Sequence, residues 1–116
     1  MKAFLIDPFA RSITEVDFDG NYKSIYPFIG ADLFTGAYPW ENGDMIYVDD
    51  EGLFKSDQAF FVANGYGPLA GKGLVLGTGA NGDNAEPLTA LADLNVDWVV
   101  IDSTAPQGWV VAGGAQ

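Results

Sequence analysis

Residues 32–48 read DLFTGAYPWENGDMIYV, and this stretch decides the fold class. The apolar run over 32–38 predicts one strand, and the run over 45–48 predicts a second. Asn42-Gly43 lies between them and is typical of the tight turn of a β-hairpin, because both residues tolerate a positive φ. The sequence therefore predicts antiparallel pairing of these two strands.

Short strand signals, separated by turn residues, continue on both sides of this hairpin. Residues 2–18 predict an opening hairpin with a turn at Asp7-Pro8, because proline pushes the residue before it away from helical geometry. Further strands are expected at 53–55, 59–62, 74–76, 96–101 and 107–112. The glycine-rich stretches 64–73 and 78–84 are predicted to be loops.

Two short helices complete the predicted fold. Apolar residues within 22–29 recur at i, i+3, i+4 and i+7, which predicts a helix over 22–30. Pro27 requires that helix either to start late or to kink. A second helix is predicted over 86–94, with Pro87 near its start. The expected fold class is α+β, a mostly antiparallel sheet of five to seven strands with two short helices, as a single domain over 1–112 with a disordered tail over 113–116.

The charge balance is strongly acidic. The 116 residues include 16 acids and 5 bases, a net charge of −11, and neither Cys nor His. Such a chain is repelled by nucleic acid and by anionic membranes, so direct binding to either is disfavoured. The missing residue types exclude disulfides, Ser-His and Cys-His catalysis, and zinc sites built on His or Cys. We expect no enzyme activity, no cofactor, no metal, and a cytoplasmic location, because no signal peptide or membrane-spanning pattern is visible.

Acidic residues concentrate around two predicted turns within 44–51. Clustered carboxylates can bind calcium, but the spacing differs from that of a helix–loop–helix calcium site, and Asp is common in turns for conformational reasons. Surface carboxylates can also imitate phosphates and dock on a basic protein. The residues predicted to contact such a partner are Trp40, Glu41, Asp44, Asp49, Asp50, Glu51 and Asp57. For Trp40 the alternative is that its ring folds back over the sheet and closes the core.

Two glycine-rich segments resemble phosphate-binding loops without matching them fully. Residues 77–82 fit the G-x-G-x-x-G pattern, but no helix follows directly. Residues 67–73 have one residue too few between the glycines, and Gly73 replaces the Ser or Thr that would hold magnesium. Gly71, Lys72 and Gly73 are the candidate contacts to a ligand or anion. The alternative for Lys72 is a solvated side chain beside a turn.

Several segments appear in an order that resembles a known family. They are 1–8 (MKAFLIDP), 13–16 (ITEV), 22–26 (YKSIY), 29–30 (IG), 42–44 (NGD), 48–53 (VDDEGL) and 68–77 (PLAGKGLVLG). The family consists of small proteins carried by phages and conjugative elements and catalogued as a domain of unknown function. The resemblance covers 1–94, whereas the chain from about Asn95 departs from it. It carries no reaction, but it implies an accessory role against host defence, with 49–52 and 71–73 as contact candidates.

Three functional hypotheses follow. The leading one is a small acidic phage or mobile-element protein that binds and inhibits a host defence complex, of the anti-CRISPR or antirestriction type, by imitating nucleic-acid phosphates. Its partner would be a basic, nucleic-acid-binding host protein in the host cytoplasm. The second is a small-ligand or nucleotide sponge that uses the loops at 65–73 and 77–82. The third is a structural or regulatory phage protein that self-associates through edge strands or Trp40, and the sequence leaves the oligomeric state open.

Overall fold

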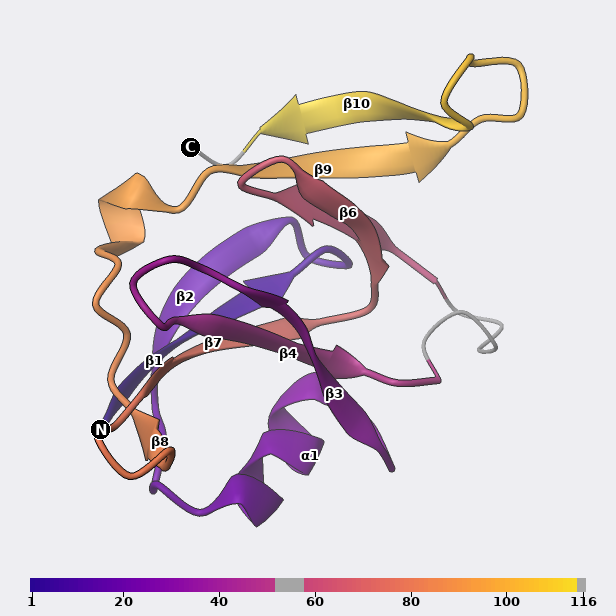
Figure 1. Cartoon of the computed structure of the whole chain (residues 1–116). Helices are drawn as coiled ribbons and strands as arrows, with labels where there is room; N and C mark the ends of the chain where they lie inside the picture. The colour runs from indigo at the N-terminus through magenta and orange to yellow at the C-terminus, as the bar shows by residue number, and fades with distance from the viewer. Residues whose placement is uncertain (52–57, 115–116) are drawn as a thin grey trace.

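The structure is a computed structural model that describes residues 1–51 and 58–114, except for the side chain of Tyr38. These residues form two antiparallel sheets and very little helix (Figure 1). The prediction of an α+β fold with two helices is therefore wrong, because the described chain is mostly antiparallel β-sheet. The expected strand at 53–55 and the candidate residue Asp57 lie outside the described residues.

The larger sheet, here called the central sheet, has the strand order β2-β1-β7-β4-β3, and β8 pairs with β7. Its strands are β1 (Lys2–Asp7), β2 (Ser12–Asp17), β3 (Phe34–Pro39), β4 (Met45–Asp49), β7 (Gly73–Thr78) and β8 (Asn84–Ala85). The predicted hairpins at 2–18 and 32–48 are present as the β1–β2 and β3–β4 pairs. Strand β7 enters between β1 and β4 and joins these two hairpins into one sheet.

The second sheet has the order β10-β9-β5-β6. Its strands are β5 (Phe60–Ala63), β6 (Tyr66–Ala70), β9 (Val96–Ile101) and β10 (Trp109–Gly114). Strand β10 extends through Gly114, past the boundary at residue 112 that the sequence suggested, and pairs Gly113 and Gly114 with β9.

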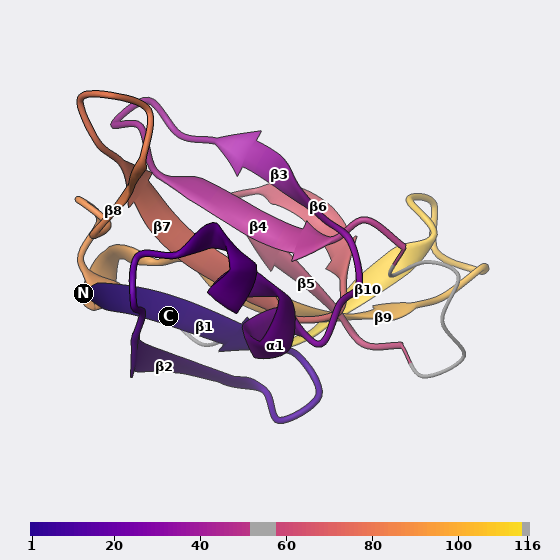
Figure 2. The same ribbon diagram turned by 90° about the horizontal axis from the view of Figure 1, so that it is seen from below.

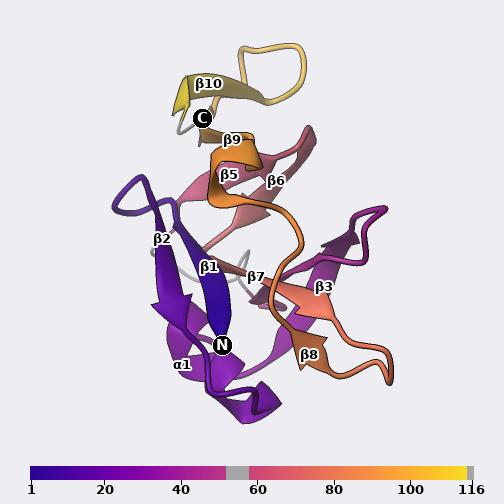
Figure 3. The same cartoon turned by 90° about the vertical axis from the view of Figure 1, so that its left-hand side faces the viewer.

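The two sheets and the helix form three layers, with the central sheet in the middle (Figures 2 and 3). One cluster of buried side chains, which includes Phe4, Ile46 and Phe61, fills the space between the sheets. A second cluster lies between the central sheet and the helix. On β7, Val75 belongs to the first cluster while Leu74 belongs to the second. A strand covered on both faces reads as a continuous apolar run, which explains the sequence of β7.

The helical segment consists of the 3-10 turn η1 (Tyr22–Ser24) followed by α1 (Ile25–Ile29). The Asn21 side chain caps η1 by accepting from the Lys23 backbone N–H at 3.0 Å. Pro27 falls in the first turn of α1, where its missing N–H breaks no intrahelical bond. Of the two alternatives predicted for Pro27, a late start or a kink, the structure shows the late start.

Two local predictions are wrong. Over 86–94 the chain forms only the 3-10 turn η3 (Leu91–Asp93), because the backbone of Ala90 is extended, with φ −73° and ψ 150°, and this interrupts a continuous helix. Over 64–73 the chain forms β6 instead of a loop. Asn64 and Gly65, both with positive φ, make the turn that leads from β5 into β6.

Candidate partner-binding surface and pocket

The carboxylate of Asp44 ties the β3–β4 loop to the segment after β8. Asp44 is fully buried, its Oδ1 accepts a 3.0 Å hydrogen bond from the Leu88 N–H, and its Oδ2 accepts one of 2.8 Å from the Thr89 N–H. The Asn42 side chain fixes the loop by accepting from the Asp44 N–H at 3.0 Å. A carboxylate saturated in this way stabilises the fold and cannot reach a partner, so the prediction for Asp44 is wrong.

The predicted acidic turn at 49–51 is only partly exposed. Asp49 is 8% exposed, and its Oδ1 accepts a 2.9 Å hydrogen bond from the Glu51 N–H, the pattern of an Asx turn. Asp50 and Glu51 are exposed. The turn therefore offers two of its three carboxylates to solvent, and Asp49 acts inside the turn rather than on the surface.

The remaining candidates do not form one patch. Glu41 is exposed in the loop before the first residue of β4. Asp50 and Glu51 follow the last residue of the same strand. A five-residue strand separates them by about 16 Å at ~3.3 Å per residue. Trp40 is half-buried and packs against the core between the sheets. This agrees with the alternative prediction that its ring folds back over the sheet. Within 1–51 and 58–114, no group of three His, Cys, Asp or Glu side chains could hold a metal ion.

The segment 71–73 is built for chain reversal and packing. Gly71 has a φ of 82° in the turn between the two sheets. A Cβ on Gly73 would lie 2.9 Å from the Phe61 ring, so glycine is needed there for close packing. Lys72 Nζ lies 4.0 Å from Asp7 Oδ2. An anion at Lys72 would meet the Asp7 carboxylate too, so this geometry gives the anion interpretation no support.

The glycine pattern at 77–82 belongs to the β7–β8 hairpin. The Gly79 N–H donates to the Asp83 carbonyl at 2.7 Å, and the Gly82 N–H donates to the Gly79 carbonyl at 3.0 Å. Both groups are thus used inside the turn and do not point at a ligand. A Cβ on Gly77 would lie 2.3 Å from the Glu86 carbonyl oxygen, so this glycine permits close backbone approach. The nucleotide interpretation gains no support from this loop.

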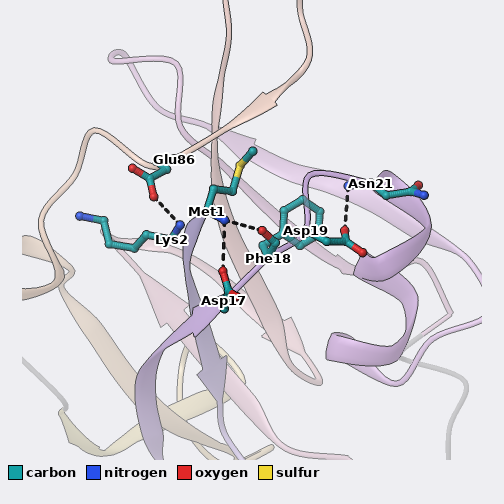
Figure 4. Close-up of polar contacts among 7 residues, drawn as sticks. All are labelled: Met1, Lys2, Asp17, Phe18, Asp19, Asn21 and Glu86. Atoms are coloured by element: carbon teal, nitrogen blue, oxygen red, sulfur yellow. Dashed lines mark hydrogen bonds and ion pairs between the residues drawn. The ribbon is translucent and has the colours of Figure 1, made fainter.

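Acidic side chains from distant parts of the sequence meet at the edge of the central sheet beside Met1 (Figure 4). The Met1 amino group lies 3.2 Å from Asp17 Oδ1, and Glu86 accepts a hydrogen bond from the Lys2 N–H. The Asp19 carboxylate accepts a 2.7 Å hydrogen bond from the Ser24 hydroxyl and one of 2.8 Å from the Asn21 N–H. These two bonds lower the pKa of Asp19. Sequence reasoning missed this group because no local pattern brings β2 and residue 86 together.

An open pocket of about 480 Å³ lies beside this edge, between η1 and the β7–β8 hairpin. Three aromatic residues contribute to its lining: Tyr22, Phe34 and Tyr47. Its polar lining comes from Asp83 and Asn84, and Asp83 is the one charged residue. The Tyr47 hydroxyl donates to Asn84 Oδ1 at 3.3 Å, and burial raises the pKa of Tyr47.

Edge-to-face ring contacts involve two of the three aromatic lining residues, Phe34 and Tyr47. Ring centroids are 5.7 Å apart between Phe34 and Tyr47 and 4.8 Å apart between Phe34 and Tyr26 of α1. The sequence showed these rings as parts of strands and of a helix face. It gave no signal that they would line a common pocket.

Most carboxylates of the described chain point to solvent without a neighbouring cation. The exposed ones are Glu15, Asp17, Asp19, Asp32, Glu41, Asp50, Glu51, Asp83, Glu86 and Asp93. In the described ranges, ion pairs within 4.0 Å involve only Asp7, with Lys72, and Asp17, with the Met1 amino group. The negative charge of the sequence is therefore displayed on the surface.

Together these features define a two-sheet antiparallel β protein with an acidic surface that is largely unneutralised. The chain belongs to the family described as a domain of unknown function, DUF3846, whose model matches residues 1–96. This confirms the resemblance to a domain of unknown function. Neither a curated protein nor a solved structure matches the chain. The family match ends at the first residue of β9, so nearly all of β9 and all of β10 lie beyond it.

None of the helices formed by the described residues has the length and apolar character needed to cross a lipid bilayer.

Proposed function

We propose that the protein acts by binding, not by catalysis, and that it docks its acidic surface on a basic surface of a partner protein. The observation that carries this proposal is the set of exposed carboxylates without neighbouring cations on the described chain. Complementary charge accelerates association and makes it sensitive to salt. A basic partner is favoured over nucleic acid or an anionic membrane, because both of these carry the same sign of charge as the protein.

The partner class proposed is a nucleic-acid-binding protein of a host defence complex, such as a restriction enzyme or a CRISPR effector. In this proposal the protein is an accessory product of a phage or mobile element and acts in the host cytoplasm. The support is chemical, because carboxylates can occupy the positions of phosphates on a basic groove. Asp44 and Asp49 have no part in this contact, since both are buried.

Recovery of a partner from host lysate tests the proposal. Tagged protein should retain a nucleic-acid-binding protein at low salt and release it at high salt. The double variant Asp50→Lys/Glu51→Lys reverses two exposed charges and should weaken retention at least tenfold. The double variant Glu15→Lys/Asp93→Lys, which reverses two exposed charges on β2 and η3, is the matched control for charge reversal. A retained partner that is itself acidic, or retention that does not change with salt, would contradict the proposed mode of binding.

A second candidate is self-association through β10. This strand is an edge of the second sheet, and its Val110 and Val111 are 38% and 55% exposed. An edge strand with exposed apolar side chains is a template for pairing with another chain. Light scattering should then show a dimer that Val111→Lys converts to a monomer. A monomer at all concentrations would remove this candidate.

A further inference from the structure

We infer that the aromatic pocket between η1 and the β7–β8 hairpin binds an arginine side chain of the basic partner. This inference rests on the proposed function and names a contact within it. The juxtaposition that supports it is three aromatic residues, Tyr22, Phe34 and Tyr47, beside the single carboxylate of Asp83.

The pocket has the chemistry that a guanidinium group requires. Arginine stacks its planar guanidinium on aromatic faces and pairs with carboxylates, and it loses hydration more readily than lysine. Asp83 is exposed and supplies the negative charge, while Asn84 presents its side-chain oxygen to the Tyr47 hydroxyl in the same lining. An anionic ligand would be repelled by Asp83 and by Asp19, which follows β2 and precedes the lining residue Gly20.

The pocket is also of suitable size and is accessible. Its volume of about 480 Å³ lies within the range of ligand-binding sites and exceeds what one guanidinium group fills. Tyr22 is 54% exposed, so a ring is available for stacking at the rim. A Cβ on the lining residue Gly82 would have no atom within 4 Å, so the hairpin is not packed against another element at this residue.

The carboxylates at the pocket favour a cation there, because Asp83 is in the lining and Asp19 precedes the lining residue Gly20. Asp19 keeps its charge to low pH because hydrogen bonds from Ser24 and Asn21 lower its pKa. Lys23 of η1 is exposed next to Tyr22, and Lys2 lies near the Phe4 ring, 6.0 Å from its centroid. Phe4 belongs to the core between the sheets, so Lys2 lies over the face of the central sheet opposite α1.

The direct test uses a blocked arginine, N-acetyl-arginine methylamide, titrated into the isotopically labelled protein and followed by NMR. The amide signals of 82–84 and the Asn84 side-chain signals should shift with saturation in the millimolar range. The citrulline analogue, which has the same shape without the charge, should shift them at least threefold less at equal concentration. Equal shifts with both compounds, or shifts spread evenly over exposed acids such as Glu41 and Asp93, would overturn the inference.

Variants separate this inference from the proposed function. Asp83→Asn and Tyr22→Ala should each weaken arginine binding about threefold to tenfold, whereas Asp93→Asn and Tyr66→Ala, matched changes away from the pocket, should leave it unchanged. The same variants are then tested against the partner recovered from lysate. Loss of partner affinity in the pocket variants supports the inference. Salt-sensitive partner binding that ignores Asp83 and Tyr22 would overturn the arginine contact and leave the proposed function standing.

Discussion

The carboxylate of Asp44 accepts a 2.8 Å hydrogen bond from the backbone N–H of Thr89, a residue on a segment that follows β8. Thr89 is bound a second time, because its Oγ1 accepts a 2.9 Å hydrogen bond from the Asn42 side chain. The loop of the β3–β4 hairpin thus fixes the path of the chain as it passes from the central sheet toward the second sheet.

Removal of the Asp44 carboxylate should destabilise the protein strongly. Asp44→Ala leaves the N–H groups of Leu88 and Thr89 without their acceptor and empties the buried site of the carboxylate, and we expect a loss of about 3 kcal/mol in the free energy of unfolding. Asp44→Asn keeps the size of the side chain but can place an N–H donor against a backbone donor, so it should cost about 2 kcal/mol. Urea denaturation measures both losses.

Asp93→Asn is the control for this prediction, because Asp93 is exposed. Hydrogen exchange supplies an independent measurement, since the Leu88 and Thr89 amides should lose protection in the Asp44 variants. Unchanged stability together with unchanged protection at these two amides would show that the Asp44 carboxylate does not hold Leu88 and Thr89 in place.

Substitution of Gly77 should also be costly. A Cβ there would lie 2.3 Å from the Glu86 carbonyl oxygen, so Gly77→Ala must displace backbone and should destabilise by about 2 kcal/mol. Gly79→Ala is the matched control, because the nearest atom to its Cβ would lie at 3.4 Å, an ordinary contact. Thermal unfolding compares the two variants, and equal midpoints would contradict the proposed contact.

Acid titration should reveal the bond between Asp19 and Ser24. The Ser24 hydroxyl is the main cause of the lowered pKa of Asp19, followed by the Asn21 N–H. A carboxyl whose pKa is lower in the folded state adds stability above its unfolded pKa of 3.8. This stability is lost as the pH falls through the folded pKa. Ser24→Ala should therefore raise the pKa of Asp19 toward 3.8, as followed by NMR of the carboxyl carbon.

Asp102 is an internal control for this titration. The Thr104 hydroxyl lowers the pKa of Asp102 through a 2.6 Å hydrogen bond, and Ser24 does not contact it. In Ser24→Ala the pKa of Asp102 should remain low while that of Asp19 rises. Movement of both groups together would point to a general change in the protein rather than to loss of one hydrogen bond.

Alkaline pH should weaken the fold through Tyr47. Burial raises the pKa of this phenol, so the folded state favours the neutral form. The resulting stability is fully present below the unfolded pKa of 10.0 and is lost as the pH rises through the higher folded value. Tyr47→Phe should reduce the fall in stability above about pH 10, measured by denaturation across pH 9–11. Tyr66→Phe, on an exposed tyrosine of β6, should leave the fall in place.

The strands that local pattern could reveal were predicted well, and the helix over 86–94 was not. Asn42-Gly43 and the flanking apolar runs specify the β3–β4 hairpin within a short window, so the sequence alone was sufficient. Leu88 and Leu91 are spaced as on a helix, but Ala90 between them is extended, and Asp44 fixes the path of 88 and 89 from far away in the sequence. The glycines of 64–73 led to the prediction of a loop in place of β6. Gly65 lies instead in the hairpin turn before this strand.

The candidate surface was predicted less well than the fold. Composition showed that the surface must be acidic, and this holds for the described residues. Asp44 and Asp49 were predicted to contact a partner, but both are buried in the structure. Glu41 lies on the other side of β4 from Asp50 and Glu51, so these three residues do not form one surface. The pocket is lined by Tyr22, Phe34 and Tyr47, which belong to three different elements. Such convergence is a property of the tertiary fold and leaves no trace in a local sequence window.

The place of β7 between β1 and β4 has a consequence for how the chain is made. The ribosome produces the β1–β2 and β3–β4 hairpins first, yet each keeps an unpaired edge until Thr78 has emerged. At about 5–20 residues per second this interval lasts several seconds after β1 is complete. Through that time the apolar side chains of Ile6 and Ile46 have no finished core to enter. A nascent chain in this condition is most exposed to pairing with other chains before β7 has emerged.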